Sequence, residues 1–153
     1  MSARRLAIAE QIALAKWDSG TPVEDASREA QVIASAIKAG ESRGLDQATV
    51  SNFFRAQIEA NKLDQYSLLA EWRRLGKAPD HTPVNLASTI RPQLDQLETA
   101  MIAELAETAD IRASASCRTD IAKAVGKYVS THKNGFSPLK AIALDRATVA
   151  VCS

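Results

Sequence analysis

Residues 16–29 read KWDSGTPVEDASRE and join two predicted helices through a tight turn. Lys16 stands at the end of the first helix, and the cluster Asp25-x-x-Arg28-Glu29 opens the second. The turn returns these charged residues to one end of a helix pair, beside positions with apolar periodicity. A charged helical hairpin is therefore the element on which the rest of the chain is expected to pack.

The composition is typical of a helical protein, because Gly and Pro are few and only 5% of the 153 residues are aromatic. The net charge of +1 argues against a nucleic-acid or anionic-membrane partner, which would need a clustered basic excess. No apolar run approaches the ~18 residues that a membrane span needs. We predict an all-α fold with one domain over residues 1–153, a bundle of about six helices whose third helix is the longest.

The first predicted helix covers residues 3–17 and carries two cations on its apolar face. Arg5 and Lys16 share that face with Ile8 and Ile12. About 16 Å separates the two cations along the helix axis, so their side chains could enclose a small metabolite. Alternatively, both side chains extend into solvent from the ends of a core stripe.

The second helix is predicted to begin within the quoted stretch and to run to about residue 40. Thr21 would be its N-cap, with Pro22 at the first helical position and Glu24 completing a capping box. Arg28 and Glu29 could then be an ordinary charge pair of a first helical turn, or part of a site.

The third helix, residues 47–75 with Asp46 as its cap, places two amides inside an apolar stripe. Asn61 and Gln65 lie one turn apart on that stripe. A buried amide without a hydrogen bond costs about 1–3 kcal/mol. The two amides therefore indicate an internal polar site, or they satisfy each other and the backbone.

Later helices are predicted from Ser88 or Thr89, over about residues 117–130, and from Ser137 to about residue 151. If the last two are antiparallel, Cys117 at the start of one meets Cys152 at the end of the other. This geometry favours a disulfide, which closes a loop of about 35 residues and contributes about 3.5–4 kcal/mol in the chain-entropy model. A disulfide would place the mature protein in the periplasm or outside the cell.

The usual catalytic motifs are missing from the sequence. His81 and His132 lie in predicted loops without a cysteine or carboxylate at ligand spacing, so no metal site is predicted. There is no glycine-rich phosphate loop and no nucleophile elbow, and no cofactor is expected.

Four cations remain at positions that face the predicted core: Arg5, Lys16, Arg28 and Arg91. Fixed cations in one helical interior repel each other unless an anion lies between them. A small dicarboxylate would satisfy them, because guanidinium groups bind carboxylates in a bidentate manner. Such a site could bind without catalysing, or could catalyse a reaction that needs only conformational selection and electrostatics.

The ordered set of polar residues resembles the all-helical class of chorismate mutase. That set is Arg5, Lys16, Asp25-x-x-Arg28-Glu29, Asn61-x-x-x-Gln65 and Arg91. The late helices with Cys117 and Cys152 are similar to the secreted (gamma) subclass, whose members carry a cleaved leader and a disulfide. The resemblance covers nearly the whole chain and is most specific in residues 5–72.

The resemblance implies that chorismate is rearranged to prephenate, a unimolecular pericyclic reaction without a covalent intermediate. Family members hold the folded diaxial conformer and stabilise charge on the ether oxygen. The resemblance also implies a periplasmic or secreted protein whose leader has been removed, and a homodimer. The alternatives from the residues alone are a non-catalytic helical module that binds a dicarboxylate, and a structural protein with a salt-bridged core.

The resemblance also divides the polar residues by role. The expected catalytic residues are Lys16, Gln65, Arg28 and Glu29. The expected substrate-binding residues are Arg5, Asp25, Asn61 and Arg91. Lys16 and Gln65 would donate to the ether oxygen, and Glu29 would accept from the ring hydroxyl. Some relatives have Glu in place of Gln65, and Glu must be protonated to donate, so activity here is expected to persist above neutral pH.

Overall fold

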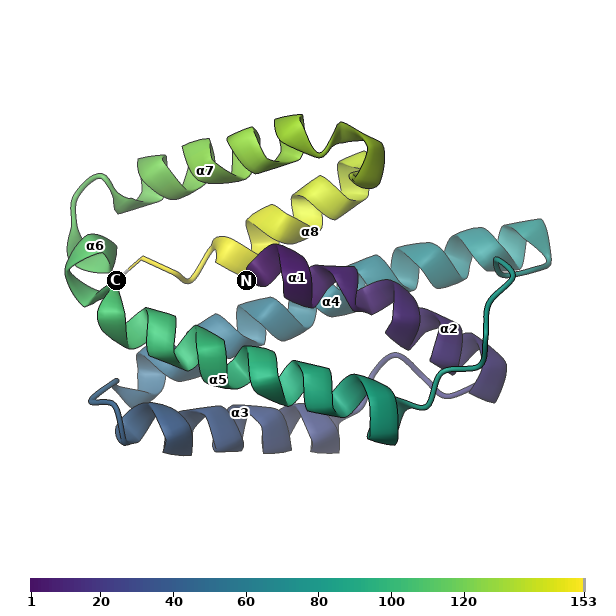
Figure 1. Ribbon diagram of the computed structural model, residues 1–153, viewed down its shortest axis with the longest axis horizontal. Coiled ribbons are helices and arrows are strands. Elements are labelled where there is room, and N and C mark those ends of the chain that lie inside the picture. Colours follow the sequence, from purple (N-terminus) through teal and green to yellow (C-terminus); the bar gives the residue numbers. More distant parts are fainter. Residues whose placement is uncertain (153) are drawn as a thin grey trace.

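A 29-residue helix, α4 (Gln47–Leu75), runs through the computed structural model, which describes residues 1–152 (Figure 1). The carboxylate of Asp46 accepts a hydrogen bond from the Thr49 N–H at 2.9 Å and caps its start. Gly76 ends it in the left-handed conformation, at φ 73°. Both boundaries agree with the sequence prediction, because both signals are local.

The first predicted helix is divided into α1 (Ser2–Ala7) and α2 (Ala9–Ser19). Ile8 between them keeps right-handed helical dihedrals, and its carbonyl still accepts from the Ile12 N–H at 3.1 Å. The two segments therefore form one interrupted helix. No proline or glycine marks the interruption, so the sequence did not predict it.

The predicted start of the second helix is wrong. Helix α3 (Ala26–Glu41) begins after Asp25, whose Oδ1 atom accepts from the Arg28 N–H at 3.0 Å. Two overlapping N-cap signals compete here, and Asp25 caps the helix instead of Thr21. Val23 is buried against Leu14, Leu69 and Trp72, and this packing holds the preceding segment outside the helix.

The fourth predicted helix begins earlier than expected. A π-helical turn, η1 (Leu86–Ile90), leads into α5 (Arg91–Glu107), and the side chain of Asn85 accepts from the Ser88 N–H at 2.9 Å. Pro92 has no N–H to donate and its ring crowds the preceding turn, and a widened turn accommodates both effects.

The remaining elements are α6 (Ala109–Ala113), α7 (Cys117–Thr131), the 3-10 turn η2 (Lys133–Gly135) and α8 (Pro138–Thr148). Eight α-helices are present in residues 1–152, against about six predicted, because of the interruption at Ile8 and the short α6. The last helix stops about three residues before the predicted end. The long helix is consequently the fourth.

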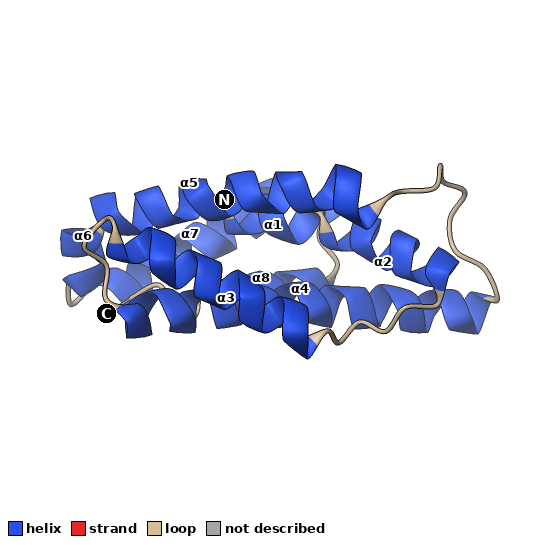
Figure 2. Ribbon diagram, turned by 90° about the horizontal axis from the view of Figure 1, so that it is seen from below, coloured by secondary structure: helices blue, strands red, loops and turns tan. Residues whose placement is uncertain are grey.

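The helices pack as an elongated bundle around α4, as predicted for an all-α fold (Figure 2). Helices α3 and α5 lie along one side of α4, and α8 lies against it with α7 on the outside (Figure 1). One core cluster joins α3, α4 and α5 through Phe53, Phe54 and Met101. A second, with Ile12 and Ile90, joins α2 to η1 and α5. Members of both clusters, Phe54 of the first and Ile12 and Ile90 of the second, line one polar cavity.

Hydrogen bonds from Gln57 of α4 connect the segments near both ends of the chain. The amide of Gln57 donates to the Ser2 hydroxyl and to the Ala147 carbonyl, both at 2.8 Å. The expected disulfide joins Cys117 at the start of α7 to Cys152, with a Cα–Cα distance of 5.9 Å. Within the described part of the chain, no helix has both the length and the apolar character needed to cross a bilayer.

Candidate active site

A cavity of about 150 Å³ lies between α1, α2, α3, α4 and the start of α5. All eight residues singled out in the sequence line it: Arg5, Lys16, Asp25, Arg28, Glu29, Asn61, Gln65 and Arg91. Ile12, Val32 and Ile90 supply apolar wall. The structure thus gathers side chains from five helices that are separated by up to 86 positions in sequence.

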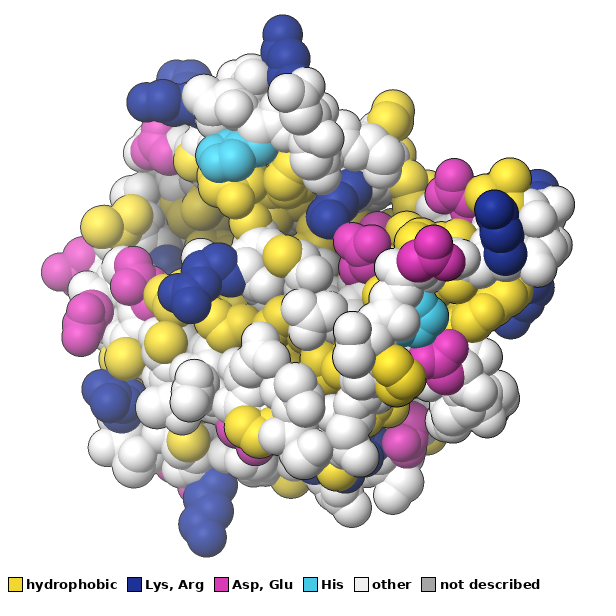
Figure 3. Space-filling view, turned by 45° about the vertical axis from the view of Figure 1, so that its right-hand side comes forward, with side chains coloured by type: hydrophobic (Ala, Val, Ile, Leu, Met, Phe, Trp, Pro, Cys, Tyr) yellow, Lys and Arg dark blue, Asp and Glu magenta, His cyan; other side chains and the backbone are white. Residues whose placement is uncertain are grey.

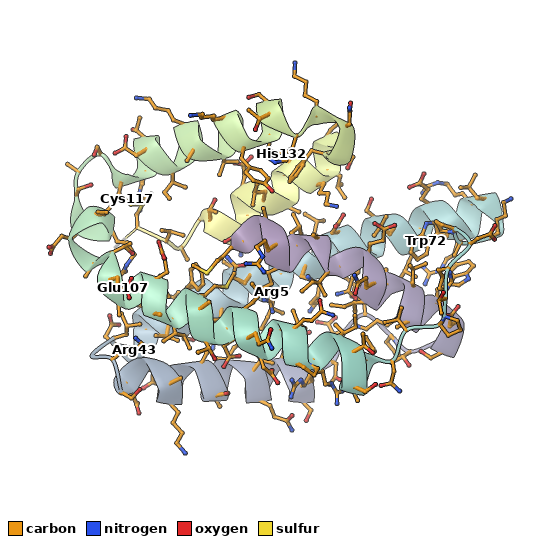
Figure 4. The ribbon with its side chains drawn as sticks, viewed as in Figure 1. Arg5, Arg43, Trp72, Glu107, Cys117 and His132 are labelled. Carbon is orange, nitrogen blue, oxygen red and sulfur yellow. A yellow bond between two sulfur atoms is a disulfide. The ribbon has the colours of Figure 1, made fainter. Side chains whose placement is uncertain are left out.

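Arg5 is the most enclosed cation of the cavity, with 7% of its surface exposed. It lies between α1 and α5 (Figure 4), and its Nη1 donates to the Gln57 carbonyl at 2.8 Å. Burial lowers the pKa of Arg5 to about 10, and the nearby carboxylate of Glu98 partly offsets this. The guanidinium therefore stays charged at neutral pH and is held in a fixed orientation.

Lys16 is anchored by the segment that precedes α3. Its Nζ donates to the Val23 carbonyl at 2.8 Å. Burial lowers the pKa of Lys16, and the carboxylates of Asp25 and Glu29 act in the opposite direction. The non-helical segment before α3, which the sequence did not predict, thus places a backbone acceptor beneath the ammonium group.

The two amides of α4 form a chain of hydrogen bonds that starts at the backbone of α1. Asn61 Nδ2 donates to the Arg5 carbonyl at 3.0 Å, and Asn61 Oδ1 accepts from Gln65 Nε2 at 2.7 Å. Both amides are buried, with 5% and 4% exposed. Gln65 Oε1 has no hydrogen-bond partner among the described residues. The contacts fix which end of the Gln65 amide is the donor.

Sequence reasoning missed three charged residues of the cavity. Lys62 Nζ lies 3.0 Å from a carboxylate oxygen of Glu29, and Asp95 lies 3.8 Å from Arg28. Glu98 is half-buried and accepts from the Ser35 hydroxyl at 3.1 Å. Burial raises the pKa of Glu98, although that hydrogen bond and the arginines lower it.

A spacing signal for two of them was present. Asp95 and Glu98 follow Arg91 by four and seven residues, so all three share one face of α5. Lys62 offered no such signal, because its partners Glu24 and Glu29 come from a different helix and its loop.

The cavity keeps a surplus of unpaired positive charge. Five cationic and four acidic side chains line it. Two ion pairs, Glu29–Lys62 and Arg28–Asp95, each neutralise one cation and one carboxylate. Arg5, Lys16 and Arg91 form no ion pair with a carboxylate of residues 1–152. Asp25 and Glu98 also form no ion pair within residues 1–152, so the formal surplus of the cavity is one positive charge. Three cations that form no direct ion pair can bind the carboxylates of a small ligand.

The chain resembles known proteins over almost its full length. The family model "Chorismate mutase type II" matches residues 2–66, which contain every predicted site residue except Arg91. A secreted chorismate mutase of Mycolicibacterium smegmatis is 30% identical over 151 residues, which cover 99% of this chain and 82% of that protein.

Two solved structures are similar in fold as well as in sequence. The chorismate mutase of Burkholderia phymatum matches with a TM-score of 0.93 at 43% identity, covering 99% of this chain and 92% of that one. The chorismate mutase of Burkholderia thailandensis matches with a TM-score of 0.91 at 33% identity, covering 99% and 94%.

Proposed function

This chain belongs to the chorismate mutase family, and from that premise we propose that it rearranges chorismate to prephenate in the cavity between α1, α2, α3, α4 and α5. The observation that carries the proposal is the set of three cations without a carboxylate partner, Arg5, Lys16 and Arg91, around one enclosed space. Chorismate has two carboxylates, which can form bidentate hydrogen bonds with those arginines.

The reaction needs neither a nucleophile nor a proton transfer, so the cavity has to supply geometry and electrostatics. Holding the folded conformer removes the entropy of reaching it. Fixed donors beside the ether oxygen stabilise the negative charge that develops there as the bond to carbon breaks. The buried, hydrogen-bonded side chains of this cavity are suited to both tasks.

We assign the two substrate carboxylates to Arg5, Arg28 and Arg91. Arg5 is already held by the Gln57 carbonyl and would lose little further conformational freedom on binding. Arg28 has a long contact of 3.8 Å to the exposed Asp95, which a substrate carboxylate can replace. Arg91 lies on the exposed side of the cavity and would close over the ligand.

We assign the ether oxygen to Lys16 and Gln65. The hydrogen-bond chain from the Arg5 carbonyl through Asn61 supports this assignment, because it orients the Gln65 amide and leaves its second N–H hydrogen for the substrate. Asn61 was expected to bind the substrate directly. Its observed contacts support a positioning role instead, acting through Gln65.

Glu29 is assigned to the ring hydroxyl. Its carboxylate lies 3.0 Å from the Lys62 ammonium and can accept a hydrogen bond from that hydroxyl. Asp25 lies at the same end of the cavity, where it caps α3 and holds Arg28 and Glu29 in place.

The test is to mix the protein with chorismate and follow the loss of its ultraviolet absorbance. Acceleration over buffer is expected, together with saturation in chorismate. Binding of chorismate without turnover would support a non-catalytic dicarboxylate module, and absence of both would contradict the assignment of the cavity.

We also propose that the protein acts outside the cytoplasm. A relative that is similar over 99% of this chain is named a secreted chorismate mutase, and the Cys117–Cys152 disulfide suits an oxidising compartment. The homodimer implied by the family resemblance stays a prediction. Size-exclusion chromatography with light scattering would test it.

A further inference from the structure

A second cavity, of about 320 Å³, lies on another side of α4 and shares no residue with the first. It lies between α4, Glu10 of α2 and the connection from α7 to α8. Figure 3 shows a hollow on this face, with acidic and basic side chains around it, below the tip that carries a histidine. Its volume is at the lower end of the range for small-molecule sites.

Asp64 of α4 is the unusual residue of this cavity. Only 4% of its surface is exposed, and it forms no hydrogen bond or ion pair with any residue of the described chain. Its Oδ2 atom is fully enclosed without a partner. A buried carboxylate without a direct ion pair costs several kcal/mol, so a positively charged ligand that pairs with Asp64 would remove an unfavourable contribution.

The surroundings indicate the charge of that partner. Three acidic residues, Glu10, Asp64 and Glu71, and two lysines, Lys133 and Lys140, line the cavity. Burial raises the pKa of Asp64 and Glu10 raises it further, whereas Lys140 lowers it. Neither lysine lies within ion-pair distance of these acids. One positive charge would therefore balance the cavity.

The same cavity has an apolar part. Leu68 and Phe136 line it, and the Lys140 ammonium lies 5.9 Å from the centre of the Phe136 ring. A ligand with an ammonium group and a short apolar body would match both parts, since an ammonium group has three donors and Asp64 Oδ1, unlike Oδ2, is not fully enclosed and accepts no hydrogen bond from residues 1–152.

We propose that this second cavity binds a small organic ammonium ion, with its ammonium group donating to Asp64 and its apolar part against Leu68 and Phe136. The inference does not depend on the mutase activity, because the two cavities have no lining residue in common. A zwitterion matches less well, because it brings no net positive charge to a cavity lined by three acids and two lysines.

The test uses the full chain and 2-phenylethylamine as the probe, measured by titration calorimetry. The amine should bind at least about tenfold more tightly than 2-phenylethanol, its neutral counterpart, a difference of about 1.4 kcal/mol. Asp64→Asn should weaken amine binding by a similar factor. Lys140→Gln should tighten it, because a like charge is removed. Asp120→Asn, an exposed charge change on α7, is the matched control and should leave the affinity unchanged.

Several results would overturn the proposal: no amine binding at millimolar concentration, equal affinity for the amine and the alcohol, or unchanged affinity in Asp64→Asn. Displacement of the amine by chorismate would place it in the first cavity and would equally contradict the inference. Tighter binding of phenylalanine than of the amine would show that the cavity prefers zwitterions, which contradicts the proposal. If Asp64→Asn does not fold by circular dichroism, the Lys140→Gln result decides, and weaker binding there contradicts the proposal.

Discussion

Gln65→Glu should convert a pH-independent donor into one that works only when protonated. The wild-type amide donates at every pH, whereas a glutamate donates to the ether oxygen only in its neutral form. The ionised form would also place negative charge beside an oxygen that is itself becoming negative. Activity of the variant should therefore fall as pH rises.

The structure indicates where this fall should occur. Position 65 is 4% exposed. Burial favours the neutral form of a carboxyl group and raises its pKa above the ordinary value for glutamate of about 4.3. The ammonium of Lys16, in the same cavity, opposes the shift and limits it.

The size of the effect follows from the loss of one fixed donor, which is about 2.7–4 kcal/mol, or about 100- to 1000-fold in kcat. We expect Gln65→Glu to approach wild-type turnover at acidic pH and to lose this factor well above its raised pKa. The assay is chorismate consumption across a pH series in buffers of constant ionic strength.

The control is Gln31→Glu, which makes the same charge change at an exposed position of α3 and should keep the wild-type profile. A flat profile for Gln65→Glu, or activity that increases with pH, would refute the assignment of Gln65 to the ether oxygen. A sharp loss of wild-type activity between mildly acidic and neutral pH would refute it as well.

Three further predictions concern turnover and stability. Lys16→Met should lower kcat about 100- to 1000-fold, and near-normal turnover in this variant would exclude Lys16 as a donor to the ether oxygen. Because burial lowers the pKa of Lys16, wild-type turnover should decline at a lower alkaline pH than an ordinary lysine would give. Cys117→Ser removes the disulfide and should lower the free energy of unfolding by about 3.5–4 kcal/mol and Tm by about 7–15 °C. Mutase activity should be retained at room temperature, and an unchanged melting curve would contradict the prediction. Gly40→Ala should lower the free energy of urea unfolding by about 1–3 kcal/mol, because its Cβ would lie 2.7 Å from Val50 Cγ2. Gly126→Ala in α7 meets nothing within 4 Å and should raise that free energy by about 0.5–1 kcal/mol. Equal effects of the two substitutions would refute the packing argument.

Helix identity and most helix ends could be predicted from sequence, because their signals are local. Asp46, Gly76 and Ser137 act on backbone groups within four residues of themselves, and each ends or begins a helix where expected. Thr21 carried an equally good signal and failed. The outcome there depended on Val23 packing against residues of α2 and α4, which no local pattern contains.

The cavity residues could be found because a charged or amide side chain inside an apolar stripe is conspicuous. Their partners could not. Lys62 and Asp95 are ordinary surface residues in a linear pattern, and only the packing of α3 against α4 and α5 brings them to Glu29 and Arg28. The second cavity was missed for the same reason, since Asp64 and Lys140 line one cavity only because the chain returns along α4 as α8.

All eight cavity residues that were predicted from the sequence lie within the span from Arg5 to Arg91 of a single polypeptide. A cavity with these eight residues unaltered therefore requires one unaltered chain. In genetic terms, two alleles that each inactivate a different site residue should fail to complement one another, because no mixed assembly would rebuild a cavity. The total activity in a cell would be proportional to the number of chains without a mutation in the site.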